Sequence, residues 1–316
     1  MSQPNSNNKV VVVGSLSMDL VLTVPRLPKI GETLQGQSFN TFVGGKGNNQ
    51  ALAAARLGAR VAMLGQVGDD EYGKIVLDNL KQNNVDTSHM LVDKNVGTGI
   101  ANIWVGPDGS NSIIIIANSN GTLSPKHVEQ CQTMLDNSKV LLLQLEIPME
   151  TVVAAAQAGK ARGLTVVLNP APAPADGKLS SELLHLVDVF VPNETEAQLL
   201  TGILPDDNDK AVSCAAALIA MGPKAVILTL GDRGALVLQK GGKPEFISSH
   251  KVKVVDSTAA GDAFVGALGA KLAEGESLTE SVRYGCAAGA LACTVSGAAP
   301  SLPTAAALES LLVSSR

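Results

Sequence analysis

Short apolar runs and longer amphipathic stretches alternate along most of the chain. The runs at 10–13, 60–65, 140–145 and 225–230 are almost wholly apolar, which is typical of strands buried on both faces of a parallel sheet. Helical spacing of apolar residues separates such runs, for example over 149–162. This alternation predicts an α/β fold with a doubly wound, mostly parallel sheet flanked by helices.

Two segments depart from that pattern. Residues 20–43 carry Pro and Gly between short alternating stretches, one of them at 33–37, which favours edge strands and turns. Residues 98–105 and 112–117 alternate on either side of a Pro-Asp-Gly turn, which predicts a hairpin. We therefore expect one large domain, spanning the whole chain, that carries a small β appendage.

One predicted strand–turn–helix junction has the residues of a reaction centre. A strand-like run at 253–255 leads through small residues to a helix that we expect to start near Ala259. The amides of Ala260, Gly261 and Asp262 would then lack helical partners and could bind a phosphate. Asp262 could take a proton from an attacking hydroxyl, or it could simply cap the helix.

Polar residues follow two of the apolar runs. Ser15, Ser17 and Asp19 come after the run at 10–13, and Glu146 ends the run at 140–145. Open α/β sheets bind ligands at the carboxyl ends of their strands. Asp19 could accept hydrogen bonds from two neighbouring hydroxyls, or it could form an ordinary turn.

A glycine-rich segment opens the first predicted helix. Gly44, Gly45 and Gly47 precede an Ala- and Leu-rich stretch, and Lys46 and Asn49 offer donors to hydroxyl oxygens. The segment has neither the P-loop nor the dinucleotide-binding spacing. An ordinary glycine-rich loop before a helix is the alternative interpretation.

Two further stretches are ambiguous by themselves. Asn193 and Glu196 have the spacing of a helix capping box. Gly231 and Gly234 predict a tight hairpin whose peptides could meet phosphates, although a plain β-turn explains them equally well.

Composition narrows the class of protein. The chain has 316 residues, 45% of them hydrophobic, and a net charge of −5 from 24 basic and 29 acidic residues. Without a basic block, we expect neither nucleic acid nor a membrane as partner. The four Cys and four His show no zinc or disulfide spacing. We expect a cytoplasmic protein with a loose tail at residues 1–8.

The stretches described above, together with one other, resemble the ribokinase-like family of sugar and nucleoside kinases, in the right order and over essentially the whole chain. They are residues 10–14 with Asp19, GGKGNNQA at 44–51, QLE at 144–146, NPAPA at 169–173, PNETEA at 192–197, TLGDRG at 229–234 and AAGDAFVGA at 259–267.

The resemblance implies a site for each substrate. The implied sugar-binding residues are Ser17, Met18, Asp19, Gly45, Lys46, Gly47, Asn48, Asn49, Glu146 and Asp262. The implied ATP-binding residues are Asn193, Thr229, Leu230, Gly231, Asp232, Arg233, Gly234, Gly261, Asp262 and Cys286.

Metal ions and a partner are implied as well. Glu196 would hold Mg²⁺ indirectly, through water. A K⁺ site would be formed by Asp256, Thr258, Ala292, Val295, Gly297 and Ser301. Segments of about 18–43 and 97–117 would form a β lid over the sugar, through which two copies would form a homodimer.

The implied reaction is ATP-dependent phosphorylation of D-ribose at O5 to D-ribose 5-phosphate and ADP, with Asp262 as general base and the amides of 260–262 as anion hole. Ser17 stands where many members have Asn, and Cys286 where His or Asn is common, so a kinase for 2-deoxyribose or another sugar is the first alternative. A non-catalytic sugar-binding regulator is the second, and a dehydrogenase is the least favoured because the glycine fingerprint is missing.

Overall fold

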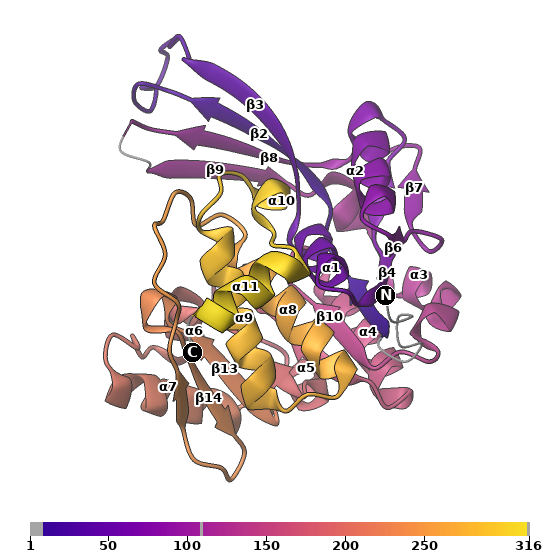
Figure 1. Cartoon of the computed structure of the whole chain (residues 1–316). Coiled ribbons are helices and arrows are strands. Elements are labelled where there is room, and N and C mark those ends of the chain that lie inside the picture. The colour runs from indigo at the N-terminus through magenta and orange to yellow at the C-terminus, as the bar shows by residue number, and fades with distance from the viewer. Residues whose placement is uncertain (1–8, 108–109, 315–316) are drawn as a thin grey trace.

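The computed structural model describes residues 9–107 and 110–314 (Figure 1). The expected tail at 1–8 and the tip of the expected hairpin turn, at 108–109, lie outside the described residues.

A mostly parallel sheet of nine strands forms the centre, in the order β15-β14-β13-β12-β11-β10-β1-β4-β6. Within this sheet only β14 runs against the other strands, because it pairs antiparallel with β13 on one side and with β15 on the other. The strands are β1 (Lys9–Val13), β4 (Arg60–Leu64), β6 (Val85–Asp86), β10 (Val140–Leu143), β11 (Thr165–Leu168), β12 (Val189–Phe190), β13 (Ala225–Thr229), β14 (Ala235–Gln239) and β15 (Glu245–Ile247). The predicted fold class is confirmed, and the strand order reverses direction between β1 and β10, where such sheets bind ligands.

Helices cover both faces of this sheet, which explains why its strands are apolar without interruption. Along β1, Val10 and Val12 pack into one core, whereas Val11 and Val13 pack into the other. The first core is covered by α1 (Lys46–Arg56), α2 (Glu71–Gln82), α8 (Ala260–Glu274), α9 (Leu278–Ala292) and α11 (Ala305–Ser314). The second is covered by α3 (Pro125–Gln130), α4 (Met149–Ala161), α5 (Ser181–Leu186), α6 (Glu194–Thr201) and α7 (Asn208–Ala220).

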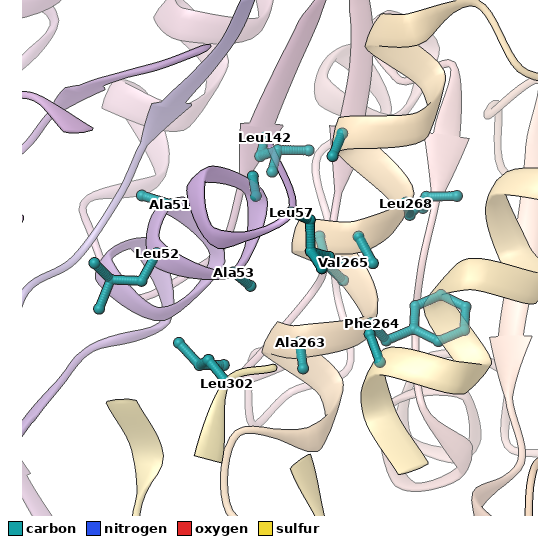
Figure 2. Packing of buried hydrophobic residues seen from close by; sticks show 14 of the residues in the cluster. Ala51, Leu52, Ala53, Leu57, Leu142, Ala263, Phe264, Val265, Leu268 and Leu302 are labelled. Carbon is teal, nitrogen blue, oxygen red and sulfur yellow. The ribbon is translucent and has the colours of Figure 1, made fainter. Parts of the chain in front are cut away.

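Within the first core, α1 and α8 pack against each other at very short range. Figure 2 shows side chains of both helices, among them Ala53 and Val265, in one cluster. A Cβ atom on Gly266 of α8 would lie 2.5 Å from the Cβ of Ala53 and 2.8 Å from the carbonyl oxygen of Gln50. Small residues on both helices therefore let their backbones approach closely, and this fixes α1 relative to α8.

A second sheet of four strands projects from one end of the main sheet (Figure 1). Its order is β3-β2-β8-β9, with β2 (Ser17–Thr23), β3 (Ser38–Gly44), β8 (Gly99–Val105) and β9 (Asn111–Ile116). We call these four strands the lid sheet. The antiparallel pairing of β8 with β9 confirms the predicted hairpin.

The strand expected at 33–37 is wrong, because pairing between β2 and β3 stops where Thr23 meets Ser38. Pro25 follows shortly after and has no N–H to donate to a ladder. Residues 33–37 therefore lie beyond the end of their partner strand, in a connecting loop.

The strand expected at 253–255 is also wrong. Val254 and Val255 are 64% and 59% exposed, and the segment after β15 runs as a loop. The N–H of Val255 donates to the carbonyl of Cys293 at 2.8 Å. This loop is therefore tied to the end of α9, and it reaches α8 without joining the sheet.

The remaining elements are short. They are β5 (Gln66–Gly68), β7 (Leu91–Asp93), η1 (Asn118–Thr122), η2 (Gln132–Leu135), η3 (Gly231–Arg233) and α10 (Ala298–Ser301). Across residues 9–107 and 110–314, no helix has both the length and the apolarity that a membrane crossing requires.

Candidate active site

The loops after β1 and β10 meet the start of α1 at the point where the strand order reverses. The hydroxyl of Ser15 donates to Oε2 of Glu146 at 2.6 Å, and the N–H of Lys46 donates to the same oxygen at 3.0 Å. Glu146 is therefore held by one group from each neighbouring segment. The expectation that a carboxylate ends this strand region at the ligand-binding edge is met.

Asp19 lies on β2 with 8% of its surface exposed. Its Oδ1 accepts a hydrogen bond from the hydroxyl of Ser17 at 3.0 Å. Burial, the largest cause, and the nearby charges of Glu146 and Asp262 together raise the pKa of Asp19 to about 6, although the Ser17 hydroxyl and Lys46 act to lower it. Asp19 is thus not an ordinary turn residue but a buried carboxylate that faces two others.

The glycines before α1 are required by contacts with the segment that follows β1. Gly45 has a φ of 90°, and a Cβ atom there would lie 2.7 Å from the Cα of Leu16. A Cβ atom on Gly47 would lie 2.6 Å from the backbone of Gly14 and Ser15. These positions exclude any side chain, so they are more than an ordinary glycine-rich loop.

Asp262 sits in the first turn of α8, 7% exposed, and does not cap that helix. Its Oδ2 accepts a hydrogen bond from Nδ2 of Asn49 at 2.9 Å, and its Oδ1 accepts one from Nε2 of Gln50 at 3.1 Å. Burial raises the pKa of Asp262 above its ordinary value, although Lys46 and the two amides act to lower it. The capping alternative is therefore wrong, because both carboxylate oxygens are held by α1.

The backbone at the start of α8 differs from the prediction in one amide. Ala259 has a φ of 61°, in the left-handed region, and the N–H of Ala260 donates to the carbonyl of Ser257 at 3.2 Å. The N–H of Ala260, one of the three amides expected to bind an anion, is thus already used in a hydrogen bond of the tight turn. Those of Gly261 and Asp262 have no backbone partner among the described residues, and a Cβ atom on Gly261 would meet nothing within 4 Å. Room for an anion exists at these two amides.

Lys46, the first residue of α1, lies half-buried among carboxylates. Burial acts to lower its pKa, but the carboxylates outweigh burial and raise it. In order of decreasing effect, these are Asp262, Glu146, Glu196 and Asp19. Four carboxylates from separate parts of the chain thus surround one cation.

The capping box at the start of α6 is present. The N–H of Asn193 donates to Oε2 of Glu196 at 2.9 Å, and the N–H of Glu196 donates to Oδ1 of Asn193 at 2.8 Å. Glu196 is 8% exposed, and burial raises its pKa to about 7, while Lys46 lowers it and Asp262 raises it. The charges of Lys46 and Asp262 thus act on this capping Glu, and its role in the site stays a prediction.

The hairpin between β13 and β14 lies beside α6. Thr229 pairs with Asn193 in an isolated parallel bridge. The N–H groups of Leu230, Arg233 and Gly234 all donate to carbonyls of the same turn. The peptides of this turn that could meet a phosphate are consequently those of Gly231 and Asp232, and the guanidinium of Arg233 donates to Glu194 at 2.6 Å.

The residues implied in K⁺ binding are brought together next to the start of α8. Thr258 donates to Oδ1 of Asp256 through its N–H at 2.9 Å and its hydroxyl at 2.6 Å. The N–H of Gly297 donates to Oδ2 of Asp256 at 2.9 Å, and the hydroxyl of Ser301 donates to the carbonyl of Thr258 at 3.5 Å. Ala292 and Val295 lie at the end of α9, linked by a bond of 3.3 Å from the N–H of Val295 to the carbonyl of Ala292.

Met18, Asn48 and Cys286 are among the implied site residues whose side chains are buried. Met18, Asn48 and Cys286 are 2%, 0% and 6% exposed, and Met18 and Cys286 belong to the first core. Burial raises the pKa of the Cys286 thiol to about 12. Direct side-chain contacts of these residues with a substrate stay predictions.

Sequence reasoning missed Gln50, which donates to Asp262, and the two amides that are bonded to Gln50. Gln50, Gln144 and Asn169 form a connected set next to Asp262. Each lies within a stretch that carried the family resemblance, and each is a polar residue inside or directly after an apolar element. A polar residue at such a position was the signal by which the sequence could have indicated these amides.

Comparison with known proteins agrees with this geometry. Residues 7–305 match the model of the pfkB family carbohydrate kinases. The chain belongs to the pfkB family of carbohydrate kinases. The resemblance to sugar kinases is therefore confirmed, and the two-sheet architecture described above is the form that this family takes here.

Similar members of this family act on pentoses, as their names state. A ribokinase from Haemophilus influenzae is 43% identical over 295 residues, which cover 93% of this chain and 95% of that protein. A deoxyribokinase from Salmonella typhi is 38% identical over 257 residues, which cover 81% and 83%. The structure of an Arabidopsis thaliana ribokinase complexed with ribose and ATP matches with a TM-score of 0.90 and 34% identity, and covers 96% of this chain and 98% of that one.

Proposed function

We propose that this carbohydrate kinase transfers the γ-phosphoryl group of ATP to O5 of D-ribose, giving D-ribose 5-phosphate and ADP. The observation that carries the proposal is the convergence of Asp19, Glu146 and Asp262 around Lys46. Asp19 and Glu146 are acceptors for sugar hydroxyls, and Asp262 lies in the first turn of a helix whose amides are free to bind an anion. Ribokinases among the relatives support ribose as the sugar.

In this mechanism, the carboxylate of Asp262 takes the proton of the O5 hydroxyl as O5 attacks the γ-phosphorus. The O5–P bond forms while the bond from phosphorus to the β–γ bridging oxygen breaks, and ADP leaves with that oxygen. The amides of Gly261 and Asp262 stabilise charge on the transferring group. Sugar hydroxyls away from O5 are held by Asp19, Glu146 and the amides next to Lys46.

We assign the nucleotide to the region between α6, the β13–β14 turn and the start of α8. Asn193, Thr229 and the free peptides of Gly231 and Asp232 lie on one side of it. Gly261 lies on the other side, and Cys286 is the residue of α9 implied to approach the base. Arg233 orders the turn through Glu194.

Glu196 fits a role in the magnesium shell. Its Oε2 is held by Asn193, and its Oε1 accepts no hydrogen bond from the described residues. An oxygen so placed can bind a water of hydrated Mg²⁺, which prefers oxygen ligands and retains several waters. When bound, Mg²⁺ would neutralise charge on the phosphates of ATP.

The loops around Asp256 fit a monovalent cation. Burial acts to raise the pKa of Asp256, but hydrogen bonds from Gly297, Thr258 and Ser296 lower it below its ordinary value. An ionised carboxylate therefore lies in these loops, and together with the backbone carbonyls of the implied residues it would supply the oxygen donors that an alkali cation accepts. We infer that K⁺ binds there and stabilises the turn that ends in Gly261.

The lid sheet is the proposed dimer interface. Ile113, Ile114, Ile115 and Ile116 of its edge strand β9 are 51%, 57%, 55% and 47% exposed. An apolar edge strand with unpaired peptide groups is a template for pairing with a second copy. The four free cysteines favour the cytoplasm as the location of this dimer.

An assay of ADP release with ribose, 2-deoxyribose, fructose and adenosine tests the function. We expect ribose to give the highest kcat/KM, and Asp262→Asn to lower kcat by at least about a hundredfold with little change in sugar affinity. Asp176→Asn, at an exposed turn, is the matched control. Normal turnover by Asp262→Asn would remove this residue as the base, and no ADP with any sugar would favour a non-catalytic regulator.

A second candidate substrate is 2-deoxyribose. The hydroxyl of Ser17 is already bonded to Asp19, so it adds little selection at the sugar's C2 position, and one relative is a deoxyribokinase. A higher kcat/KM for 2-deoxyribose than for ribose in the same assay would select this alternative.

A further inference from the structure

A chain of buried carboxamides ends on the carboxylate of Asp262. Gln50 of α1 and Gln144, directly after β10, are both 0% exposed. Nε2 of Gln144 donates to Oε1 of Gln50 at 2.6 Å, and Nε2 of Gln50 donates to Oδ1 of Asp262 at 3.1 Å. Neither glutamine is exposed enough to bind a substrate directly.

The partners of Gln50 allow only one orientation of its amide. Its nitrogen also donates to Oδ1 of Asn169 at 3.2 Å, so both of its hydrogens are used. Its oxygen is occupied by the donor from Gln144. A flipped amide would turn its oxygen toward the carboxylate of Asp262 and its nitrogen toward the nitrogen of Gln144, so it would lose every one of these bonds.

Gln144 is itself fixed by the end of β1. A Cβ atom on Gly14 would lie 2.0 Å from Oε1 of Gln144, so the side chain occupies the space that Gly14 leaves. That Oε1 is buried and has no hydrogen-bond partner among the described residues. A buried acceptor without a donor destabilises a fold, and an apolar side chain would avoid this. Stability alone therefore does not explain a glutamine here.

We propose that Gln50 and Gln144 are positioning residues for phosphoryl transfer, with Gln144 fixing the amide of Gln50 and Gln50 orienting the carboxylate of Asp262. The proposal rests on the proposed role of Asp262 as general base. In this arrangement the two amides connect the junction of β1 and β10 to the base, and the backbone does not have to move.

The proposal predicts a specific change in the pH–rate profile. Without the donor from Gln50, the ionised form of Asp262 loses a charge-assisted hydrogen bond, and the base gains a proton at a higher pH. The acid limb of kcat/KM should move up by about one pH unit, and kcat at neutral pH should fall about tenfold. The KM values for sugar and ATP should change little, because Gln50 contacts neither.

The experiment compares Gln50→Met with Gln66→Met across pH. Gln66 is a matched control, because it is a buried glutamine whose Nε2 donates at 2.9 Å to a carboxylate elsewhere, that of Asp93. We expect both variants to lose thermal stability and only Gln50→Met to move the acid limb. An unmoved acid limb in Gln50→Met would overturn the proposal.

Gln50→Glu is the second variant, should Gln50→Met fold poorly. It keeps the size of the side chain but places a second carboxyl against Asp262, and two adjacent carboxyls raise one pKa strongly. Its acid limb should lie above that of Gln50→Met. An acid limb equal to that of the unchanged protein would contradict the proposed contact.

Gln144→Leu tests the order of the two residues. If Gln144 acts through Gln50, Gln144→Leu should move the acid limb less than Gln50→Met, and the double variant should match Gln50→Met. If the two glutamines acted independently, their shifts of the acid limb would add in the double variant, and this result would overturn the proposal. Asp262→Asn distinguishes failure of the proposed base from failure of the positioning role. If Asp262→Asn retains turnover, the proposed role of Asp262 fails. If Asp262→Asn is inactive and the pH profile of Gln50→Met is unmoved, only the positioning role of the glutamines fails.

Discussion

The carboxylate of Asp19 lies directly against Gly44, where a Cβ atom would be 2.3 Å from both carboxylate oxygens. The two residues lie on neighbouring, paired strands of the lid sheet. This contact leaves no space for a side chain at residue 44, so the carboxylate that we propose to bind the sugar depends on a residue without a side chain.

Gly44→Ala should therefore displace Asp19 and weaken sugar binding. Because a carboxylate that accepts from sugar hydroxyls contributes about 1.5–3 kcal/mol, we expect affinity to fall about ten- to hundredfold. Calorimetric titration with ribose measures this. Gly36→Ala, where the nearest atom is 3.6 Å from the added Cβ, is the control and should bind normally. Unchanged affinity in Gly44→Ala would argue against Asp19 as a sugar ligand.

Asp19→Asn should stabilise the sugar-free protein at neutral pH. Folding raises the pKa of Asp19 from 3.8 to about 6, so the folded protein binds more protons than the unfolded one between these values, and stability falls as pH rises through this window. The neutral amide of the variant avoids the buried charge, which is worth on the order of 2 kcal/mol. Thermal unfolding should show that the variant is more stable above pH about 6 and equally stable below pH about 4. An equal gain in stability at all pH values would mean that packing, and not charge, causes it.

The magnesium requirement should depend on pH through Glu196. Its pKa is raised to about 7, and the ionised carboxylate accepts a stronger hydrogen bond from metal-bound water than the protonated form does. The Mg²⁺ concentration for half-maximal rate should fall as pH rises from about 6 to 8. Glu196→Gln should raise that concentration and lose the pH dependence, whereas Glu182→Gln, in the first turn of α5, should keep it.

Potassium should raise turnover more than sodium at equal ionic strength, and the difference should depend on Asp256. Asp256→Ala removes the carboxylate that accepts from Thr258 and Gly297, so we expect a loss of K⁺ activation and a fall in kcat of about tenfold. Asp209→Ala, an exposed acid on α7, serves as control. Equal rates in both salts would remove the K⁺ proposal.

Ile114→Lys should dissociate the proposed dimer, because it places a charge on the exposed face of the edge strand. Sedimentation should give a dimer for the unchanged protein and a monomer for the variant. Ile75→Lys, at a 41% exposed position of α2, should stay dimeric. A monomeric unchanged protein would refute the interface.

How far the sequence predicts this structure depends on how local each feature is. The uninterrupted apolar run at 10–13 was sufficient to predict a strand covered on both faces, because burial on two sides requires it. The shorter run at 253–255 was also expected to be strand-like, but Val254 and Val255 join no strand. Pairing at a sheet edge is decided by distant residues.

The candidate site shows the same difference between features set by local sequence and features set by distant residues. Asp262 was identified from its own turn, but Gln50, which holds it, lies 212 positions away, and no local pattern links an amide to such a partner. The occupied amide of Ala260 depends on the left-handed backbone of Ala259, a conformation that alanine rarely adopts and that its identity does not predict.

The close contact of Gly266 with α1 has a consequence for how a sugar enters and leaves. We expect the helix proposed to hold the sugar and the helix proposed to carry the base to keep their relative position throughout turnover, because this contact leaves little room for one to slide against the other. We then expect opening for exchange with solvent to come from the lid sheet, which joins α1 at the glycines before Lys46. Substitutions in that sheet should alter how fast product departs, while the geometry of phosphoryl transfer is left as it was.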